Sequence, residues 1–414
     1  MISSAEKVEL TPIAVIGQGY VGLEVSISLA IRGYKVFGLD SNGERCELIS
    51  SGISPVENVA DADLKRVLDA GHYEIGQDYS KISSCRTIII CVPTPITKGN
   101  IPDMTALENA VETISQFVAP FTLIVNESTS YPGTLRTFIA EKIKSIRKDV
   151  TNTLFFGVAP ERVSPGSGIP LSKIPRIVSG IDQKSKDLTD FLYSLFCNEV
   201  RVVDTPEIAE ASKLLENTFR QVNISFINEF NLICRKLGID TRQVIDAADT
   251  KPYGFMRFDP GAGIGGHCIP VDPLYFQYAS RVKNLESEFI ELAARANEEH
   301  AEKLLDYVLG DSNVASPRIL LLGVAYKAGV SDTRESPAEK FLSSLNKRGL
   351  LAGWFDPLVE RWNGSAPANL SDKWDIALVV TAQPGLPVQD LLGKGVKIYD
   401  FTGQLSGFEK VIQV

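Results

Sequence analysis

The feature that most constrains the fold of this chain is a glycine pattern that directly follows a short apolar run. Residues 13–16 are all apolar, and residues 17–22 read GQGYVG, which is the spacing GxGxxG. Glycine permits a tight turn and a close approach of the backbone to a ligand, because it carries no Cβ. A helical pattern follows, and the free amides at a helix N-terminus favour anionic oxygens. Strand, turn and helix together predict a Rossmann unit that binds a dinucleotide.

Asp40, at the end of the next predicted strand (residues 35–40), bears on which dinucleotide binds. Its carboxylate would accept hydrogen bonds from the adenosine ribose and repel a 2′-phosphate, which favours NAD over NADP. Arg45 weakens this preference slightly, since an arginine so close by would tolerate a phosphate. NAD is the cofactor that we expect. The expected contacts in the turn are Gly17, Gly19, Tyr20, Val21 and Gly22.

Composition excludes several classes of partner. The 414 residues carry a net charge of −9 and no basic run, so neither nucleic acid nor an anionic membrane is expected as a partner. No apolar run approaches the roughly 18 residues of a membrane span, and the first ten residues lack a signal-peptide pattern. We therefore expect a cytoplasmic protein. The six cysteines form no CxxC motif, which predicts neither a metal site nor disulfides.

Strand and helix patterns alternate in both the first and the last part of the chain, which indicates an α/β fold with two doubly wound Rossmann-like domains. The length predicts two or three domains. We expect an NAD-binding domain over residues 1–200, a central helical domain over 201–310, and a second Rossmann-like domain over 311–414.

A long helix is predicted to begin at Pro206, with Thr205 as N-cap, and to end at Gly238. At roughly 48 Å such a helix is too long for one small domain, so we expect it to join two domains and to offer a dimer surface. Lys213 and Asn217 share the face opposite the apolar one. Solvated surface is the common role of such a pair, but the continuation of this face indicates cover by another domain. The apolar face comprises Ile208, Ala211, Leu215, Phe219, Val222, Phe226, Phe230, Ile233 and Leu237.

The segment 263–273, GIGGHCIPVDP, places a cysteine on a glycine-rich turn and a carboxylate, Asp272, four residues later. The thiolate of Cys268 can attack a carbonyl carbon and hold the acyl group as a thioester. Together with a hydride-accepting cofactor, this suits the oxidation of an alcohol to an acid. His267 invites a Cys/His pair, but neighbouring side chains usually diverge, so we expect His267 to shape the substrate pocket instead.

Further candidates follow predicted strands. Thr129 comes after the strand 123–126 and Glu161 after the strand 154–158. The carboxyl ends of parallel strands are where such folds bind ligands. Lys327 and Arg334 follow the first strand of the last domain, and their charges suit a phosphorylated ligand. For each of these residues the alternative is an ordinary surface position.

Taken together, these motifs resemble the UDP-glucose/GDP-mannose dehydrogenase family over nearly the whole chain. The resemblance implies a homodimer of three-domain subunits, with NAD on the first domain and the UDP moiety on the third. The segments that carry it are Gly17–Gly22, Val92–Pro95, Glu127–Gly133, Pro160–Val163, Glu216-Asn217, Gly265–Pro273 and Tyr326–Pro337.

The residues around the cysteine also resemble one subgroup. The run GGHCIPVDP is similar to that of members acting on UDP-N-acetylhexosamines, and residues 251–256, KPYGFM, are similar to the UDP-N-acetylglucosamine type. UDP-N-acetylglucosamine is therefore the expected substrate. Gln18 stands where leucine is usual, and Arg257 stands where proline is usual. Because Arg257 lies near the expected sugar pocket, the identity of the hexosamine stays open.

The resemblance implies a four-electron oxidation of the sugar C6 through a thiohemiacetal and then a thioester on Cys268. UDP-N-acetylmannosamine or UDP-glucose as substrate, and a non-catalytic nucleotide-sugar sensor, are the alternatives. The implied catalytic residues are Cys268, Lys213, Asn217, Asp272, Thr129 and Glu161. The implied substrate contacts are Glu161, Arg162, Lys213, Asn217, Arg257, Phe258, Gly265, His267 and Lys327. The implied cofactor contacts beyond the glycine turn are Asp40, Arg45, Thr94, Thr129 and Arg334.

Overall fold

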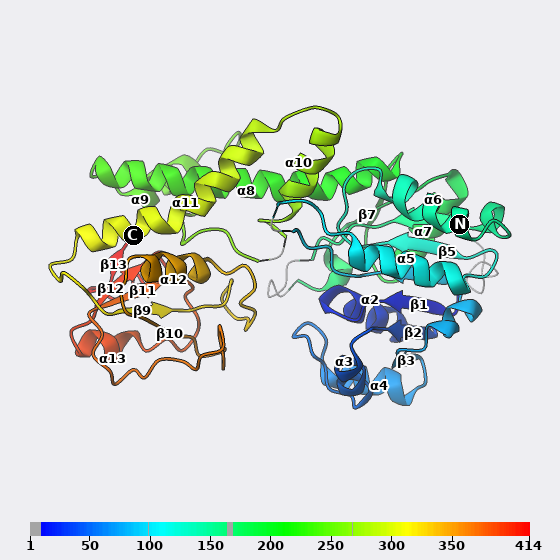
Figure 1. Cartoon of the computed structure of the whole chain (residues 1–414), viewed down its shortest axis with the longest axis horizontal. Coiled ribbons are helices and arrows are strands. Elements are labelled where there is room, and N and C mark those ends of the chain that lie inside the picture. Colours follow the sequence, from blue (N-terminus) through cyan, green and yellow to red (C-terminus); the bar gives the residue numbers. More distant parts are fainter. Residues whose placement is uncertain (1–9, 98, 164–168, 267) are drawn as a thin grey trace. The chain divides into compact units, whose positions relative to one another are not determined.

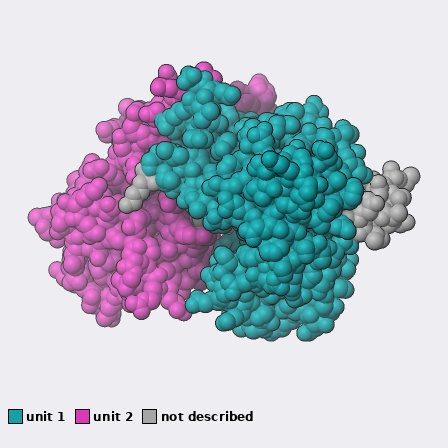
Figure 2. All heavy atoms as spheres, turned by 45° about the vertical axis from the view of Figure 1, so that its right-hand side comes forward, with its two compact units in different colours: residues 1–215, 274–284 teal, residues 216–273, 285–414 magenta. Residues whose placement is uncertain are grey.

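The computed structural model describes residues 10–97, 99–163, 169–266 and 268–414. The chain forms two compact units (Figure 2). Unit 1 comprises residues 1–215 and 274–284, and unit 2 comprises residues 216–273 and 285–414. Each unit is built around its own sheet (Figure 1).

Unit 1 holds, among its described residues, an eight-stranded sheet in the order β3-β2-β1-β4-β5-β6-β7-β8. Its strands pair in parallel except for β6 and β7, which are antiparallel. The order reverses direction beside β1, as in a doubly wound fold. The strands are β1 (Ile13–Ile16), β2 (Val36–Leu39), β3 (Tyr73–Gly76), β4 (Thr87–Ile90), β5 (Leu123–Asn126), β6 (Phe155–Val158), β7 (Arg176–Gly180) and β8 (Val200–Val202).

Helices connect these strands and cover the sheet. A π-helical segment, η2 (Thr134–Ala140), runs directly into α6. The α-helices are α2 (Tyr20–Ala30), α3 (Gly43–Ser50), α4 (Asp61–Asp69), α5 (Thr105–Phe117), α6 (Glu141–Ile146) and α7 (Gln183–Ser194). Short 3₁₀ turns lie at η1 (Tyr79–Ser84), η3 (Thr151–Thr153) and η4 (Leu171–Lys173).

Strand β1 shows why the apolar runs become central strands. All four of its residues are buried. Ile13 and Val15 belong to one hydrophobic cluster, whereas Ala14 and Ile16 belong to another. Successive side chains of a strand point to opposite faces, so the sheet is packed on both faces, as parallel sheets require. The predicted α/β class is confirmed.

The predicted long helix is present as α8 (Pro206–Lys236). Its first turn is closed by the amide of Ile208, which donates to the carbonyl of Thr205 at 3.1 Å. At the other end Gly238 adopts a left-handed conformation, with φ of +71°, and the Ile239 amide donates to the Cys234 carbonyl at 2.9 Å. A glycine at this position avoids the Cβ clash of left-handed backbone.

Unit 2 holds, in its described part, a five-stranded parallel sheet in the order β10-β9-β11-β12-β13. The strands are β9 (Ile319–Leu322), β10 (Ala352–Phe355), β11 (Ile376–Val379), β12 (Lys397–Asp400) and β13 (Ile412–Gln413). The helices after α8 are α9 (Thr241–Asp249), α10 (Asp272–Val282), α11 (Glu288–Gly310), α12 (Pro337–Lys347) and α13 (Val388–Gly393).

The two faces of α8 differ in an unusual way, because the polar face is the buried one. Lys213 and Asn217 are only 7% and 8% exposed. Much of the apolar face is open in the single chain. Its exposed members are Ile208, Leu215, Phe219, Phe226, Ile233 and Leu237. This arrangement reverses the usual amphipathic pattern of a surface helix.

Among the described residues, none of the helices combines the length and the apolar character that a membrane span needs.

Candidate active site

The glycine turn between β1 and α2 is shaped by three different contacts. Gly17 has φ of +88°, and a Cβ there would overlap the carbonyl oxygen of Cys91. A Cβ on Gly22 would overlap the carbonyl oxygen of Gly17. By contrast, apart from Gly19 and its immediate neighbours in the chain, no described atom lies within 4 Å of the position that a Cβ of Gly19 would take. Gly17 and Gly22 therefore close the turn, whereas Gly19 leaves the backbone open to a ligand.

The start of α2 suits an anionic group such as a pyrophosphate. Gly19 is its N-cap and supplies no side-chain hydrogen bond, and its fully described first turn holds no acidic residue. Tyr20 and Val21, in that turn, are half-buried. Helix N-termini carry unpaired amides and a positive partial charge. The turn therefore fits the dinucleotide that the sequence predicts.

Asp40 is buried at the end of β2, where its carboxylate is held by local donors. Oδ2 accepts from the Gln18 amide at 2.7 Å, and Oδ1 accepts from the Asn42 amide at 2.8 Å. The Arg45 guanidinium pairs with Oδ2 at 3.0 Å. Arg45 is thus occupied by the carboxylate that the sequence assigns to the ribose. Thr94, another of the predicted cofactor contacts, is half-buried, and its backbone carbonyl accepts a hydrogen bond from the Tyr275 hydroxyl at 3.0 Å.

Glu161, after β6, belongs to a buried ionic cluster at the carboxyl ends of the strands. The Arg176 guanidinium donates from Nη1 to Oε2 of Glu161 at 2.5 Å and from Nη2 to Oε2 of Glu127 at 2.7 Å. Oε1 of Glu161 accepts from the amides of Arg162 and Val163. The Tyr193 hydroxyl donates to the other oxygen of Glu127. Arg176 is 1% exposed, Glu127 1% and Glu161 7%.

The two carboxylates of this cluster are driven in opposite directions. Burial raises the pKa of Glu127 to about 7, because its attraction to Arg176 does not offset the loss of water and Glu161 adds repulsion. Burial also acts to raise the pKa of Glu161. There the charge and hydrogen bond of Arg176, the Val163 amide and the Lys213 charge outweigh it and hold the pKa below its usual range. Glu161 is therefore the carboxylate that stays ionised.

The loop that carries Thr129 is fastened to α8 by Glu210. The Glu210 carboxylate accepts from the amides of Gly133 at 2.6 Å and Leu135 at 2.9 Å, on the loop that follows β5. Glu210 is 2% exposed and lies one turn before Lys213 on α8. Burial raises its pKa to about 7, against those two amide bonds. Thr129 itself is half-buried.

Asn217 and Asp272, both in unit 2, are in contact. The sequence alone does not predict this contact. The Asn217 Nδ2 donates to Oδ2 of Asp272 at 2.6 Å. Asp272 is 2% exposed and begins α10, and its amide donates to the carbonyl of Cys268 at 2.8 Å. Asp272 therefore links Asn217 on α8 to the backbone of the cysteine.

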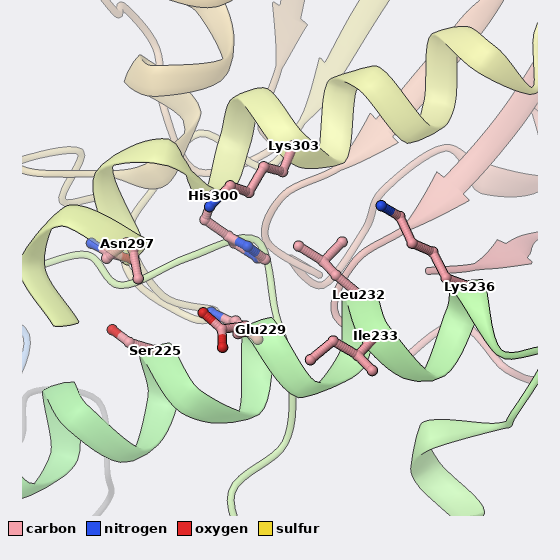
Figure 3. Close-up of a pocket in the computed structure, with 10 residues that line it drawn as sticks. Ser225, Glu229, Leu232, Ile233, Lys236, Asn297, His300 and Lys303 are labelled. Atoms are coloured by element: carbon pink, nitrogen blue, oxygen red, sulfur yellow. The ribbon is translucent and has the colours of Figure 1, made fainter. Parts of the chain in front are cut away.

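Cys268 is exposed, whereas the other five cysteines are buried or half-buried. The loop that leads to it is held by side chains from α8 and α11 within unit 2. Asn228 accepts from the Gly261 amide at 2.9 Å, His300 bonds the Gly261 carbonyl at 2.8 Å, and Asn297 accepts from the Ile264 amide at 2.8 Å. Figure 3 shows His300 projecting from α11 toward α8, beside a cavity of about 190 Å³.

The same loop packs against the C-terminal motif of unit 2. A Cβ on Gly265 would lie 2.7 Å from Cδ of Pro337 and 2.8 Å from the carbonyl oxygen of Glu335. Lys327 is half-buried, and burial together with the positive charge of Arg220 lowers its pKa. Two cations that repel each other in a partly desolvated place favour an anionic ligand.

The remaining predicted contacts lie at ordinary surface or half-buried positions. Arg257 is exposed and pairs with Asp246 at 2.7 Å and Asp259 at 2.9 Å. Arg334 is exposed and pairs with Asp332 at 2.8 Å. Arg162 donates to the Pro175 carbonyl at 2.6 Å, Phe258 packs edge-on against Phe219 with ring centroids 5.9 Å apart, and His267 lies outside the described residues.

Sequence reasoning missed Glu127, Arg176, Tyr193 and Glu210. Glu210 carried a signal, since it shares the buried face of α8 with Lys213 and Asn217. Arg176 carried none, because a single arginine at the start of a strand is indistinguishable from a surface charge until the strand order is known.

Comparisons with known proteins agree with this geometry. Profiles of the UDP-glucose/GDP-mannose dehydrogenase family match the chain in three stretches: the NAD binding domain at residues 11–200, the central domain at 207–299 and the UDP binding domain at 320–400. A UDP-N-acetyl-D-mannosamine dehydrogenase from Pyrococcus horikoshii is 35% identical over 358 residues, covering 84% of each chain. A UDP-N-acetyl-D-glucosamine 6-dehydrogenase from Pseudomonas aeruginosa is 32% identical over 357 residues, covering 84% of this chain and 83% of that protein.

A solved structure of the UDP-D-ManNAc dehydrogenase from Pyrococcus horikoshii superposes with a TM-score of 0.85 at 31% identity, covering 97% of this chain and 98% of that one. The glycine turn, the strand-end carboxylate and the exposed cysteine thus lie within stretches that match three domains of one family. This chain belongs to the UDP-glucose/GDP-mannose dehydrogenase family and begins with that family's NAD-binding domain.

Proposed function

We propose that this nucleotide-sugar dehydrogenase oxidises C6 of a UDP-N-acetylhexosamine from the alcohol to the carboxylic acid, with Cys268 as the nucleophile. The observation that carries the proposal is the placement of this thiol. It is exposed, whereas the other cysteines are buried or half-buried, and the loop before it is held by hydrogen bonds with the side chains of Asn228, Asn297 and His300. A nucleophile needs both access to the substrate and a defined position.

Bound at the glycine turn of unit 1, NAD would supply the hydride acceptor for both oxidations of C6. The turn at Gly17, Gly19 and Gly22 would hold its pyrophosphate, and Asp40 its adenosine ribose. The requirement for two equivalents follows from the chemistry, because converting an alcohol to an acid removes four electrons.

The chain's own residues divide the remaining work. After the first oxidation the Cys268 thiolate adds to the C6 aldehyde and forms a thiohemiacetal, which can lose a second hydride as a free aldehyde cannot. Lys213 and Asn217 stabilise the developing oxyanion, as donors aimed at such a charge contribute several kcal/mol. Asp272 moves protons together with Thr129.

Release of the product is a hydrolysis. Water adds to the thioester carbon, the carbon–sulfur bond breaks, and the sulfur leaves as the Cys268 thiolate. Glu161 accepts the proton of the attacking water, a role that its ionised state supports. Lys327 binds the UDP phosphates, and Arg334 lies near the cofactor.

We expect UDP-N-acetylglucosamine as the substrate, because the residues around Cys268 resemble those of the enzymes that act on it. UDP-N-acetylmannosamine is the second candidate, favoured by the similarity to the Pyrococcus horikoshii enzyme. The test is to assay the purified protein with NAD and one sugar at a time: UDP-N-acetylglucosamine, UDP-N-acetylmannosamine or UDP-glucose. The sugar with the highest kcat/KM is the substrate. Two NADH per uronic acid are expected with the true substrate. No NADH with any sugar would instead support a sensor without turnover.

The variant that tests the role of the nucleophile is Cys268→Ala. It is expected to bind the UDP-sugar with unchanged affinity, measured by calorimetry, and to form no uronic acid. A normal yield of acid from this variant would refute the assignment of the nucleophile. Cys234→Ala, at a buried cysteine on α8, controls for loss of a thiol in general.

We further propose a homodimer of subunits with domains at residues 1–200, 201–310 and 311–414. The exposed apolar face of α8 supports the dimer, since Phe226 is 63% and Leu237 66% exposed on one long helix. A contiguous apolar face of this kind is costly in water, and a twofold axis would bury it against its own copy.

A further inference from the structure

We propose that Arg176 is a positioning residue for thioester hydrolysis: it holds the Glu161 carboxylate in one orientation and as an anion, while Glu127 takes up the proton of the cluster. The inference rests on the proposed role of Glu161 and adds the buried residues Arg176, Glu127 and Tyr193 to it.

The orientation of Glu161 is over-determined by donors. Arg176 binds one carboxylate oxygen at 2.5 Å, and the amides of Arg162 and Val163 bind the other. A guanidinium and two backbone amides can only donate. Each of these bonds therefore requires an acceptor oxygen on Glu161, and a proton on either oxygen would weaken the bonds made there, because a neutral carboxyl oxygen is a poorer acceptor than a carboxylate oxygen.

The cluster holds two carboxylates and a single guanidinium. With both carboxylates ionised it carries one excess negative charge, at positions that are 1% to 7% exposed. Lys213 and Glu24 also interact with Glu161 and add one charge of each sign, so the excess of one negative charge remains when every carboxylate is ionised. An uncompensated buried charge is expensive, so one proton bound to this group lowers its free energy. The question is which carboxylate takes it.

The hydrogen-bond partners of Glu127 allow this carboxylate to bind the proton. Tyr193 bonds its free oxygen, and a tyrosine hydroxyl can turn around and accept instead of donate. A protonated Glu127 thus keeps its bond to Tyr193 and its bond from Arg176 at 2.7 Å. The raised pKa of Glu127, about 7, and the lowered pKa of Glu161 agree with this division.

The other titratable groups that interact with Glu161 lie on α8, on α2 and directly after β4. Lys213 on α8 lowers its pKa. Glu24 on α2 has its own pKa raised to about 7 by burial and by repulsion from Glu161. The buried thiol of Cys91, after β4, has its pKa raised by burial and by the two carboxylates of the cluster. Glu24 and Cys91 add no positive charge, so Arg176 and Lys213 hold Glu161 ionised.

The test uses the pH dependence of thioester hydrolysis in single turnovers of the full-length enzyme with its UDP-sugar and NAD. In wild type the hydrolysis rate falls as Glu161 becomes protonated at low pH. Arg176→Gln is expected to move this acidic limb to higher pH by at least about one unit, equivalent to about a 10-fold loss of rate below the new limb. Glu127→Gln removes a like charge and is expected to leave the limb in place or move it to lower pH.

Arg176→Lys keeps the positive charge without the fork that serves two carboxylates. It is expected to return the limb toward that of wild type while the maximal rate stays reduced. The first hydride transfer, followed as the burst of NADH, should change much less than hydrolysis in all three variants. A merely structural role would lower both steps together and leave the pH limb unmoved.

An infrared pH titration provides a readout that needs no turnover. The protonated-carboxyl band of wild type, minus that of Glu127→Gln, should titrate near pH 7. A difference band that appears only near pH 4 would overturn the inference even if hydrolysis is normal. Equal limbs in Glu127→Gln, Arg176→Gln and wild type would overturn it as well. If Arg176→Gln does not fold, Glu127→Gln and the infrared titration still decide. Absence of NADH with every sugar in wild type would instead count against the proposed function.

Discussion

The side-chain amide of Asn217 donates to the carboxylate of Asp272 at 2.6 Å, joining residues 55 positions apart. Asn217 lies on α8 and Asp272 begins α10, directly after the loop of Cys268. Both side chains are more than nine-tenths buried. A buried carboxylate holds the amide in one orientation, with its oxygen and second proton turned to fixed directions.

Removing this amide should affect catalysis more than binding. Asn217→Leu takes a donor from Asp272 and from the developing oxyanion, and we expect kcat to fall by about 10²- to 10³-fold with a smaller change in KM. Steady-state kinetics with the UDP-sugar measure both. Asn223→Leu, on the same helix with its amide bonded to the Phe219 carbonyl, is the matched control and should stay near wild type. Equal losses in the two variants would contradict the role of Asn217.

The glycine turn offers a test of cofactor binding that is separate from folding. Gly19→Ala adds a methyl group where the described chain has open space, at a φ of −83° that any residue adopts. We expect an unchanged free energy of unfolding, within about 0.5 kcal/mol, and weaker NAD binding by about 10-fold or more. Gly22→Ala, whose Cβ would overlap the Gly17 carbonyl, should lose stability as well. Chemical denaturation and calorimetry with NAD separate these outcomes, and tight NAD binding by Gly19→Ala would argue against a pyrophosphate at this turn.

His300 should make the fold sensitive to acid. Burial lowers its pKa to about 4. The folded state thus favours the neutral ring, so the stabilisation is complete above the ordinary pKa of about 6.5 and is lost as pH falls from there to about 4. The full effect is at most about 3 kcal/mol for one group. His300→Gln can still donate to the Gly261 carbonyl and does not titrate. Its free energy of unfolding, measured by denaturation at pH 7 and pH 4.5, should fall less than that of wild type over this interval.

Gln18 should be coupled to Tyr73 in stability. Its buried side chain accepts from the Tyr73 hydroxyl at 2.8 Å and from the Ser26 hydroxyl at 3.1 Å, and it donates to the Val15 carbonyl at 2.9 Å. Gln18→Leu strands the Tyr73 hydroxyl and should cost about 1–3 kcal/mol of unfolding free energy. The double variant Gln18→Leu/Tyr73→Phe removes both partners and should recover part of the loss. Additive losses in this cycle would show that the two side chains do not depend on each other.

The proposed dimer should depend on the open face of α8. Phe226→Glu places a charge in the middle of the apolar face, and we expect the molar mass from light scattering to fall to that of one chain. Leu351→Glu changes a residue that is 56% exposed, just before β10, and serves as the control with unchanged mass. A monomeric wild type would overturn the proposal directly.

Most of the elements follow from local sequence. The apolar run at 123–126 is a strand with the predicted bounds, and α8 begins and ends at its predicted signals. Other elements were not predicted, among them β7, β8 and α10. The segment that became α10 starts with Asp-Pro and has a mixed pattern, and β8 is a short, partly exposed strand, so neither carries a strong periodic signal.

The sequence by itself determined the α/β class, the NAD turn and the candidate nucleophile, because these depend on the order of residues over a few positions: a glycine spacing, a buried strand, a cysteine on a glycine-rich turn. Only the tertiary structure decided which charges meet. Glu127, Glu161 and Arg176 come from three separate strand ends, and their shared burial sets which carboxylate keeps its proton. Burial and electrostatic pairing depend on distances in space, and no spacing along the chain encodes them.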